Sequence, residues 1–208
     1  MTKICAISDT HLNHWNITIP DCDIFIHAGD SNCRTITELI DFNNWIKQIN
    51  AKFKIYVAGN HCSICEKLNI NEIKNYLQDC IYLENETLII DNIKFFGSPY
   101  SKEFNGWSFM AYEHKLKEIW DKIPEDTDIV ITHGPAYGWL DQNVHGEHCG
   151  SETLRARFEE IKPKYHITGH LHEASNILQT EHTTVINCSV LDENYKLKFQ
   201  PKVFYFEK

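Results

Sequence analysis

The stretch Asp23-Ile24-Phe25-Ile26-His27-Ala28-Gly29-Asp30 decides the fold, because a short apolar run leads directly into a polar residue that suits a metal ion. Four other apolar runs end in the same way. They are Lys3–Ser8 before Asp9-Thr10-His11, Phe53–Ala58 before Gly59-Asn60-His61, Asp128–Thr132 before His133-Gly134, and Tyr165–Thr168 before Gly169-His170-Leu171-His172. In open α/β sheets, ligands bind beyond the carboxyl ends of the strands. We therefore expect these five polar clusters to meet at one edge of the fold.

The segments between these strands predict an α/β protein. Near-helical spacing of apolar residues predicts helices at Thr35–Ile49, Ile70–Leu77, Ser108–Lys122 and Ser151–Lys162. Glu86–Ile90 and Ile93–Gly97 flank Asp91-Asn92, which predicts an antiparallel hairpin. Three further short strands are expected at Asn176–Gln179, Thr183–Asn187 and Val203–Phe206. No repeat or linker interrupts the pattern, so residues 1–208 are expected to form a single domain.

Composition narrows the class of protein. The 208 residues are 42% hydrophobic and 24% charged, which is ordinary for a globular chain. The net charge of −9 argues against a broad basic face for duplex DNA. The mean hydropathy is −0.39. The sequence contains no apolar run of about 18 residues, so it predicts no membrane span. The start, Met1-Thr2-Lys3-Ile4, fits no signal peptide, so we expect a cytoplasmic protein.

Eight cysteines are expected to be reduced thiols in that compartment. Cys5, Cys22, Cys80 and Cys188 lie beside apolar runs, and we expect them to be small buried hydrophobic residues. Cys62 and Cys65 form a C-x-x-C pair. A second such pair would be needed for a four-thiolate zinc site, and the sequence has none, so a metal or redox role is a minor alternative.

The polar clusters contain seven candidate metal ligands. The oxygen donors are Asp9, Asp30 and Asn60, and the imidazoles are His11, His133, His170 and His172. This mixture suits zinc, iron or manganese and argues against calcium. Seven ligands are too many for one tetrahedral ion but suit two ions that share a carboxylate, about 3.5–4 Å apart. Each cluster alone has a structural explanation as a turn or a hydrogen-bonded histidine, and the ordered repetition favours the metal interpretation.

Together these motifs resemble the calcineurin-like metallophosphoesterases. The resemblance covers residues 5 to about 190, and a narrower similarity links the chain to the small metallophosphoesterase-domain-containing phosphodiesterase subgroup. That narrower similarity is carried by Ile26-His27-Ala28-Gly29-Asp30, Gly97-Ser98-Pro99-Tyr100, Thr132-His133-Gly134-Pro135 and Gly169-His170-Leu171-His172-Glu173. The resemblance implies a four-layer α/β/β/α sandwich, in which two mixed β-sheets are flanked by helices.

The resemblance also implies a role for each ligand. Asp9, His11 and His172 would hold the first ion; Asn60, His133 and His170 would hold the second; and Asp30 would bridge them. His61 would contact the substrate phosphate or protonate the leaving group. The ions would be two divalent metals (manganese, iron or zinc), and they would lower the pKa of a bridging water so that its hydroxide attacks phosphorus. The family pattern commonly has an acidic residue where this chain has Cys62.

The leading functional hypothesis is a phosphodiesterase that acts on small or nucleotide diesters. The alternatives are a phosphomonoesterase or protein phosphatase and, less favoured, a metal-binding scaffold without catalysis. The acidic composition argues against a nuclease on long DNA. Secondary candidates for the pocket walls are His14, Trp15 and the segment 104–109 with Trp107, and His148 and Arg34 are candidates for phosphate contact. For each of these an ordinary packing or surface role is an open alternative.

Overall fold

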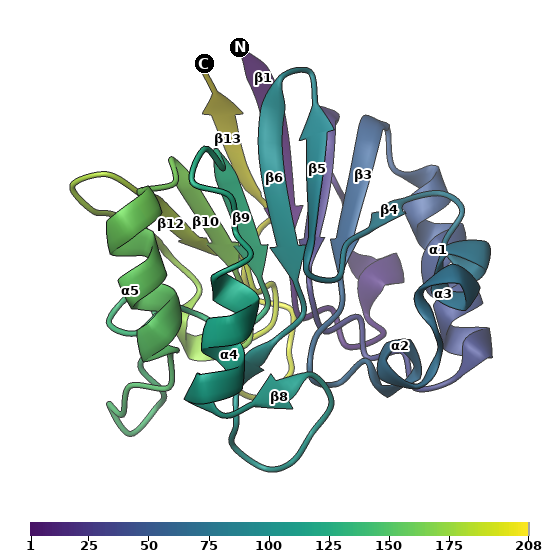
Figure 1. Cartoon of the computed structure of the whole chain (residues 1–208). Coiled ribbons are helices and arrows are strands. Elements are labelled where there is room, and N and C mark those ends of the chain that lie inside the picture. Colours follow the sequence, from purple (N-terminus) through teal and green to yellow (C-terminus); the bar gives the residue numbers. More distant parts are fainter. Residues whose placement is uncertain (208) are drawn as a thin grey trace.

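The computed structural model describes residues 1–207, and two β-sheets form its centre (Figure 1). The first sheet has the order β13-β1-β2-β3-β4, and only β13 is antiparallel to its neighbour. Its strands are β1 (Thr2–Ile7), β2 (Cys22–Ala28), β3 (Ala51–Val57), β4 (Ile81–Tyr82) and β13 (Lys202–Phe206). Parallel neighbours in this sheet bring the ends of β1, β2 and β3 to one edge.

The second sheet has the order β11-β12-β10-β9-β6-β5, with antiparallel strands at both edges. Its strands are β5 (Glu86–Ile90), β6 (Ile93–Ser98), β9 (Ile129–Thr132), β10 (Tyr165–Thr168), β11 (Ile177–Gln179) and β12 (Thr184–Asn187). A small two-stranded sheet joins β7 (Ser101–Lys102) to β8 (Met110–Ala111). The predicted hairpin is thus confirmed as the β5–β6 pair.

Helices cover the outer face of each sheet, which gives four layers (Figure 1). The helices are α1 (Ile36–Gln48), α2 (Ser63–Lys67), α3 (Ile70–Tyr76), α4 (Glu113–Trp120) and α5 (Glu152–Ile161), with 3₁₀ turns η1 (His14–Asn16) and η2 (His172–Ala174). Helices α1 and α3 pack on the first sheet, and α4 and α5 pack on the second. The expected α/β/β/α sandwich of two mixed sheets is confirmed.

Side-chain alternation along the strands explains the layers. In β1, Ile4 and Ala6 face the second sheet, whereas Cys5 and Ile7 face α1. Since both faces of a sheet between a helix layer and another sheet are buried, its strands carry buried residues on both faces, as Ile4 to Ile7 of β1 do. In β9, Ile131 lies in the apolar cluster between the two sheets and is fully buried.

Two predictions about local structure are wrong. The helix expected from Ser108 begins only at Glu113, because β8 pairs with β7 and Ser101 N donates to the Phe109 carbonyl oxygen at 2.9 Å. Cys22 and Cys80 are only half-buried, while Cys5 and Cys188 are buried as expected. Both residues nevertheless pack against the buried core between α1 and the first sheet.

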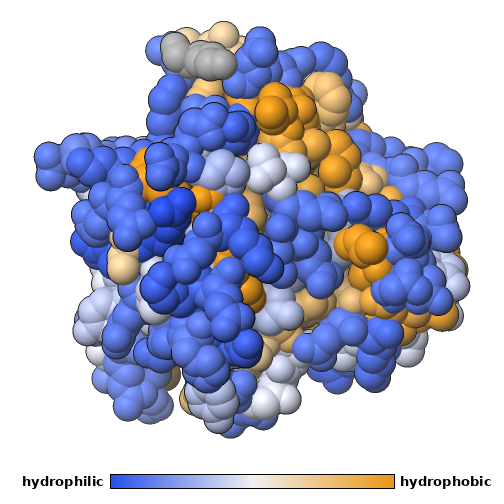
Figure 2. All heavy atoms as spheres, viewed as in Figure 1, coloured by the Kyte–Doolittle hydropathy of each residue, from blue (hydrophilic) through white to orange (hydrophobic). Residues whose placement is uncertain are grey.

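The carboxyl ends of the parallel strands in both sheets point to one end of the molecule, the lower end of Figure 1. The described parts of the two termini lie at the opposite end. Hydrophilic side chains cover most of the face seen in Figure 2, with apolar patches between them. None of the helices within residues 1–207 combines the length and the apolar character that crossing a bilayer requires.

Candidate metal centre

The loops after the strands are tied together where the two sheets meet. Ser8, directly after β1, forms a parallel bridge with Ser189, and Ser8 N donates to the Cys188 carbonyl at 2.9 Å. The next residue, Asp9, accepts hydrogen bonds at both carboxylate oxygens from the backbone N–H of His170, at 3.1 and 3.2 Å. Residues 161 positions apart in the sequence are therefore brought into direct contact.

The backbone at these loops is strained. Asp9, His11, Asp30 and His170 all have positive φ angles, of 55°, 41°, 54° and 68°. Such conformations cost non-glycine residues of order 1–3 kcal/mol each and persist only where the surrounding structure fixes them. Their concentration at one edge of the sandwich marks this edge as a functional site.

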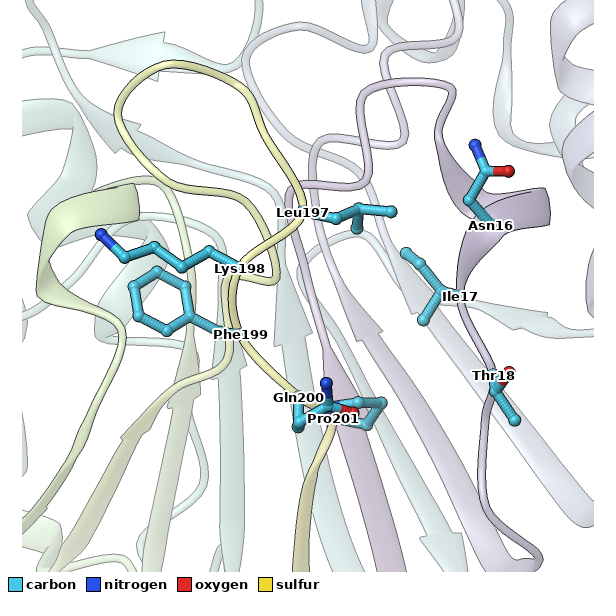
Figure 3. Close-up of a pocket in the computed structure, with 8 residues that line it drawn as sticks. All are labelled: Asn16, Ile17, Thr18, Leu197, Lys198, Phe199, Gln200 and Pro201. Atoms are coloured by element: carbon cyan, nitrogen blue, oxygen red, sulfur yellow. The ribbon is translucent and has the colours of Figure 1, made fainter.

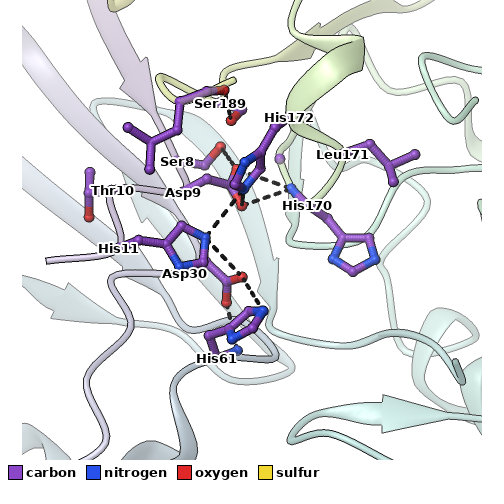
Figure 4. A network of polar contacts seen from close by, with 12 residues as sticks. Ser8, Asp9, Thr10, His11, Asp30, His61, His170, Leu171, His172 and Ser189 are labelled. Carbon is purple, nitrogen blue, oxygen red and sulfur yellow. Dashed lines mark hydrogen bonds and ion pairs between the residues drawn. The ribbon is translucent and has the colours of Figure 1, made fainter. Parts of the chain in front are cut away.

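The first donor group consists of Asp9, His11 and His172 (Figure 4). The Nε2 atoms of His11 and His172 lie 3.3 Å apart, and His172 Nε2 lies 3.5 Å from Asp9 Oδ1. His172 Nδ1 donates to the Asp192 carbonyl oxygen at 2.9 Å, which turns Nε2 toward the other two donors. Holding the second ring nitrogen in this way is how proteins orient metal-binding histidines.

The second donor group consists of Asn60, His133 and His170. Asn60 Oδ1 lies 2.9 Å from both His133 Nε2 and His170 Nδ1. His133 Nδ1 donates to the Ala28 carbonyl oxygen at 3.0 Å, so that Nε2 faces the amide oxygen. The Asn60 Nδ2 atom is buried and has no hydrogen-bond partner among residues 1–207. The amide is thus turned so that its oxygen, not its N–H₂ group, meets the two imidazoles.

Asp30 lies between the two groups. Its Oδ2 atom is 3.3 Å from His133 Nε2 in the second group and 3.7 Å from His11 Nε2 in the first. Its Oδ1 atom accepts a hydrogen bond from the backbone N–H of His61 at 2.8 Å, which fixes the carboxylate plane. One oxygen is therefore available to both groups, as a bridging ligand requires.

The arrangement fits divalent ions. Ligands about 2.0–2.2 Å from a metal lie roughly 3.0–3.5 Å from one another, and most of the donor separations fall in or near this range. When His133 is neutral, its Nε2 lone pair faces the oxygen atoms of Asn60 and Asp30. Such a cluster of buried acceptors is unfavourable unless protons or metal ions neutralise it.

Burial and mutual charge set the ionisation of this cluster. Burial alone raises the pKa of the Asp9 carboxyl, but the hydrogen bond from His172 holds it well below its usual range. His133 does the same for the pKa of Asp30. Burial lowers the pKa of His133 and His172, yet their carboxylate partners raise each pKa to about 9. Without metal, these two imidazoles are therefore the positive charges beside the carboxylates.

Two glycines allow the carboxylates to approach. A Cβ atom on Gly169 would lie 2.2 Å from Ser8 Oγ and 2.3 Å from Asp9 Oδ2. A Cβ atom on Gly59 would lie 2.4 Å from Asp30 Oδ1. Contacts this short are essentially never tolerated, so any larger residue at either position would displace a candidate ligand.

His61 lies at the mouth of the centre rather than within it. Its Nε2 atom is 4.0 Å from Asp30 Oδ2, and its ring centroid lies 5.0 Å from that of His11. The Trp107 ring packs against it at 4.8 Å. Tyr195 was not singled out by the sequence analysis, because it lies in an irregular turn without a motif. Its ring lies 4.8 Å from His11 and is 53% exposed.

The remaining candidates for the pocket wall and for phosphate contact lie in different environments. His14 is fully buried against Phe42 and Trp45, and Trp15 Nε1 donates to Asp41, so neither has the wall position considered for it. Arg34 Nε donates to Asn32 Oδ1 at 2.9 Å.

The Cys62 thiol is buried beneath the centre, 3.4 Å from Ser31 Oγ and 3.3 Å from the Tyr56 hydroxyl. Cys62 and Cys65 are free thiols, and neither belongs to a candidate metal group within residues 1–207.

Two hollows differ in their relation to this centre. A cavity of about 490 Å³ is lined by His170 together with Trp107 and His148, so it adjoins the second donor group. A smaller hollow of about 220 Å³ lies between the segments 16–18 and 197–201 (Figure 3). No candidate ligand lines the smaller hollow, whereas His170 lines the larger one.

The donor set, the edge on which it lies and the sandwich define a class of protein, the metallophosphoesterases. A family model described as calcineurin-like phosphoesterase matches residues 2–174, and the chain belongs to that family. Family membership makes it a metal-dependent hydrolase of phosphoesters.

The individual matches agree with this. The chain is 36% identical to UPF0046 protein K07C11.7 of Caenorhabditis elegans, over 99% of this chain and 76% of that protein. It is 31% identical to human metallophosphoesterase domain-containing protein 1, over 94% of this chain and 68% of that protein. One solved crystal structure aligns over 99% of both chains with a TM-score of 0.70 at 15% identity, which shows the same fold.

Proposed function

We propose that the protein is a phosphodiesterase that hydrolyses small or nucleotide diesters with two divalent ions. In this proposal, Asp9, His11 and His172 hold one ion, Asn60, His133 and His170 hold the other, and Asp30 bridges them. The observation that supports it most is the Asp30 carboxylate, whose Oδ2 atom lies 3.3 Å from His133 Nε2 and 3.7 Å from His11 Nε2. Manganese, iron and zinc all suit these donors.

Bound divalent ions supply a nucleophile at neutral pH and neutralise charge on the phosphoryl oxygens. The remaining task is to protonate the leaving alkoxide, and His61 is our candidate for it. Its backbone N–H is bonded to Asp30 Oδ1 at 2.8 Å, and its ring lies at the mouth of the centre. A positioned general acid contributes typically 10²–10⁴-fold to the rate.

The scarcity of cations supports a diester over a phosphoprotein or a dianionic monoester. Lys102 is the one cationic side chain that lines the cavity beside His170, within the part of the chain described. A diester carries one negative charge and two organic groups, and the cavity offers room for one of them. We further propose that residues 1–208 act as one domain, in the cytoplasm, where free thiols such as all eight cysteines here persist.

The test compares bis(p-nitrophenyl) phosphate with p-nitrophenyl phosphate, using protein loaded with Mn²⁺, Fe²⁺ or Zn²⁺. We expect faster hydrolysis of the diester, and a loss of at least 10²-fold in Asp30→Asn. Asp41→Asn is the matched control, because this carboxylate bonds His14 and Trp15 outside the centre. Faster hydrolysis of the monoester would replace the proposal with a phosphomonoesterase. No hydrolysis by protein that contains two ions would leave a scaffold.

A further inference from the structure

The cavity next to the centre has a position that links substrate binding to the chemistry. Its volume of about 490 Å³ falls within the range typical of small-molecule sites. His170 lines it, and this residue is a proposed ligand of the second ion. Trp107 lines it too, while its ring packs at 4.8 Å against His61, the proposed acid. A group bound in this cavity would therefore lie beside the second donor group and beside the ring that contacts His61.

One wall of the cavity is aromatic and is not explained by packing of the core. Phe104 and Trp107 are 70% and 43% exposed, respectively, and both line the cavity. Their rings meet edge to face, with centroids 6.2 Å apart at 83°. Exposed aromatic rings that face a hollow beside a catalytic centre are typical of sites that bind another flat ring.

The lining also contains an imidazole in a fixed orientation, that of His148. His148 Nδ1 donates to Asp141 Oδ1 at 2.7 Å. Asp141 is 1% exposed, and its Oδ2 atom accepts a hydrogen bond from Gly150 N at 3.1 Å, so the carboxylate itself is anchored. The Tyr137 ring also packs against His148, with 4.9 Å between the two ring centroids. The imidazole is thereby held in place by a buried carboxylate rather than left free in solvent.

The charges around the cavity disfavour a second phosphate. Its lining contains one lysine, Lys102, and two carboxylates, Glu103 and Glu147. Local hydrogen bonds hold both carboxylates in place. Glu103 accepts a hydrogen bond from Gly106 N, and Glu147 accepts one from Asn143 Nδ2. The lining therefore carries no surplus of positive charge, and a neutral group is favoured over an anionic one.

We propose that this cavity binds a neutral, planar aromatic ring of the phosphoester, seated against Trp107. The inference rests on the proposed function, since it names the organic group of that substrate. A simple aryl group and a nucleobase share this chemistry. Stacking on an aromatic side chain contributes about 1–3 kcal/mol per ring, which corresponds to roughly 5- to 150-fold in affinity.

Calorimetric titration of the metal-loaded protein tests this without relying on turnover. The three ligands are phenylphosphonate, methylphosphonate and the thymidine analogue in which a phosphonate is bonded directly to C5′. They present the same anionic head, and none has a hydrolysable ester. We expect at least one of the two aromatic ligands to bind ten or more times more tightly than methylphosphonate. The ligand that gains more identifies an aryl group or a nucleobase as the ring.

Variants make the test specific to the cavity. Trp107→Ala should reduce the preference for the aromatic ligand to below threefold, and Trp107→Phe should restore most of it. Trp15→Ala is the matched control, because this tryptophan is also exposed but bonds Asp41 outside the cavity. Equal binding of all three ligands by the wild type, or a preference that survives Trp107→Ala, would overturn the inference. Neither result would affect the proposed function, which is tested separately by the rates of diester and monoester hydrolysis.

Discussion

Gly169→Ala should disable the metal centre without altering any candidate ligand. A Cβ atom at this position would lie 2.3 Å from Asp9 Oδ2 and 2.2 Å from Ser8 Oγ, and real Cβ contacts essentially never fall below 3.0 Å. Relieving the first contact moves the carboxylate by about 0.7 Å, more than three times the roughly 0.2 Å tolerance of a metal–ligand bond. The same shift changes the distance between Asp9 Oδ1 and His172 Nε2, which is 3.5 Å in the wild type.

The expected size of the effect follows from comparable displacements. Losing the partners that orient a metal ligand lowers metal affinity about 10- to 100-fold, and a 1 Å misplacement at a catalytic centre costs about 10²-fold in rate. We therefore expect Gly169→Ala to bind the first ion at least tenfold more weakly, measured by competition with a chelating dye. Diester hydrolysis at limiting metal should fall about 10²-fold.

Gly138→Ala is the control for this prediction. Gly138 has a φ of +78°, so the substitution strains the backbone, but the nearest atom to its Cβ is Arg155 Nη1 at 3.5 Å, an ordinary contact. It should lower the melting temperature while metal affinity stays the same. If Gly169→Ala folds and binds metal within threefold of the wild type, the reasoning from close approach of Asp9 is refuted.

Three further predictions concern stability. Burial lowers the pKa of His166 to about 3, so its contribution to stability is lost as pH falls below about 6.5; from pH 7 to 5 this amounts to about 2 kcal/mol. In His166→Gln, chemical denaturation at pH 7 and pH 5 should show a correspondingly smaller loss of unfolding free energy between the two pH values. A loss equal to that of the wild type would contradict a lowered pKa for His166. Removing metal with a chelator should lower the melting temperature of the wild type by roughly 5–10 °C, as expected when the free ion is present at about 100 times its Kd. In Asp30→Asn the chelator should change the melting temperature hardly at all. An equal decrease in the wild type and the variant would contradict the proposed metal site. Ile131→Ala, fully buried between the sheets, should cost about 2–5 kcal/mol of unfolding free energy in urea titrations, and less than 1 kcal/mol would contradict its packing.

Much of the fold could be predicted because each strand has a clear chemical boundary. Runs such as Ile24-Phe25-Ile26 in β2 are apolar at every position, since α1 and the other sheet cover the two faces, and they lead into a polar cluster. Helix ends had similar signals: Thr35 and Glu38 form a capping box at the start of α1. The start of α4 could not be predicted, because pairing of β7 with β8 overrides the helical spacing of residues 108–112.

The candidate ligands could be recognised by type and position, but their grouping came only from the family resemblance and not from the local patterns. That Asp9 meets the His170 backbone depends on how the two sheets pack, which short-range patterns do not encode. Tyr195 and the Asp141–His148 pair lie in irregular loops, where no periodicity indicates the direction of a side chain. Trp107 was a candidate by residue type alone, and its contact with His61 depends on the path of its loop.

The most direct test of the metal centre is anomalous diffraction from crystals of the metal-loaded protein, recorded on both sides of the absorption edge of the metal. The account predicts two peaks about 3.5–4 Å apart, both bonded to the Asp30 carboxylate. One should have Asp9, His11 and His172 as its ligands, and the other Asn60, His133 and His170. A single peak, or ions that leave Asp30 unbound, would contradict the assignment of a bridged pair.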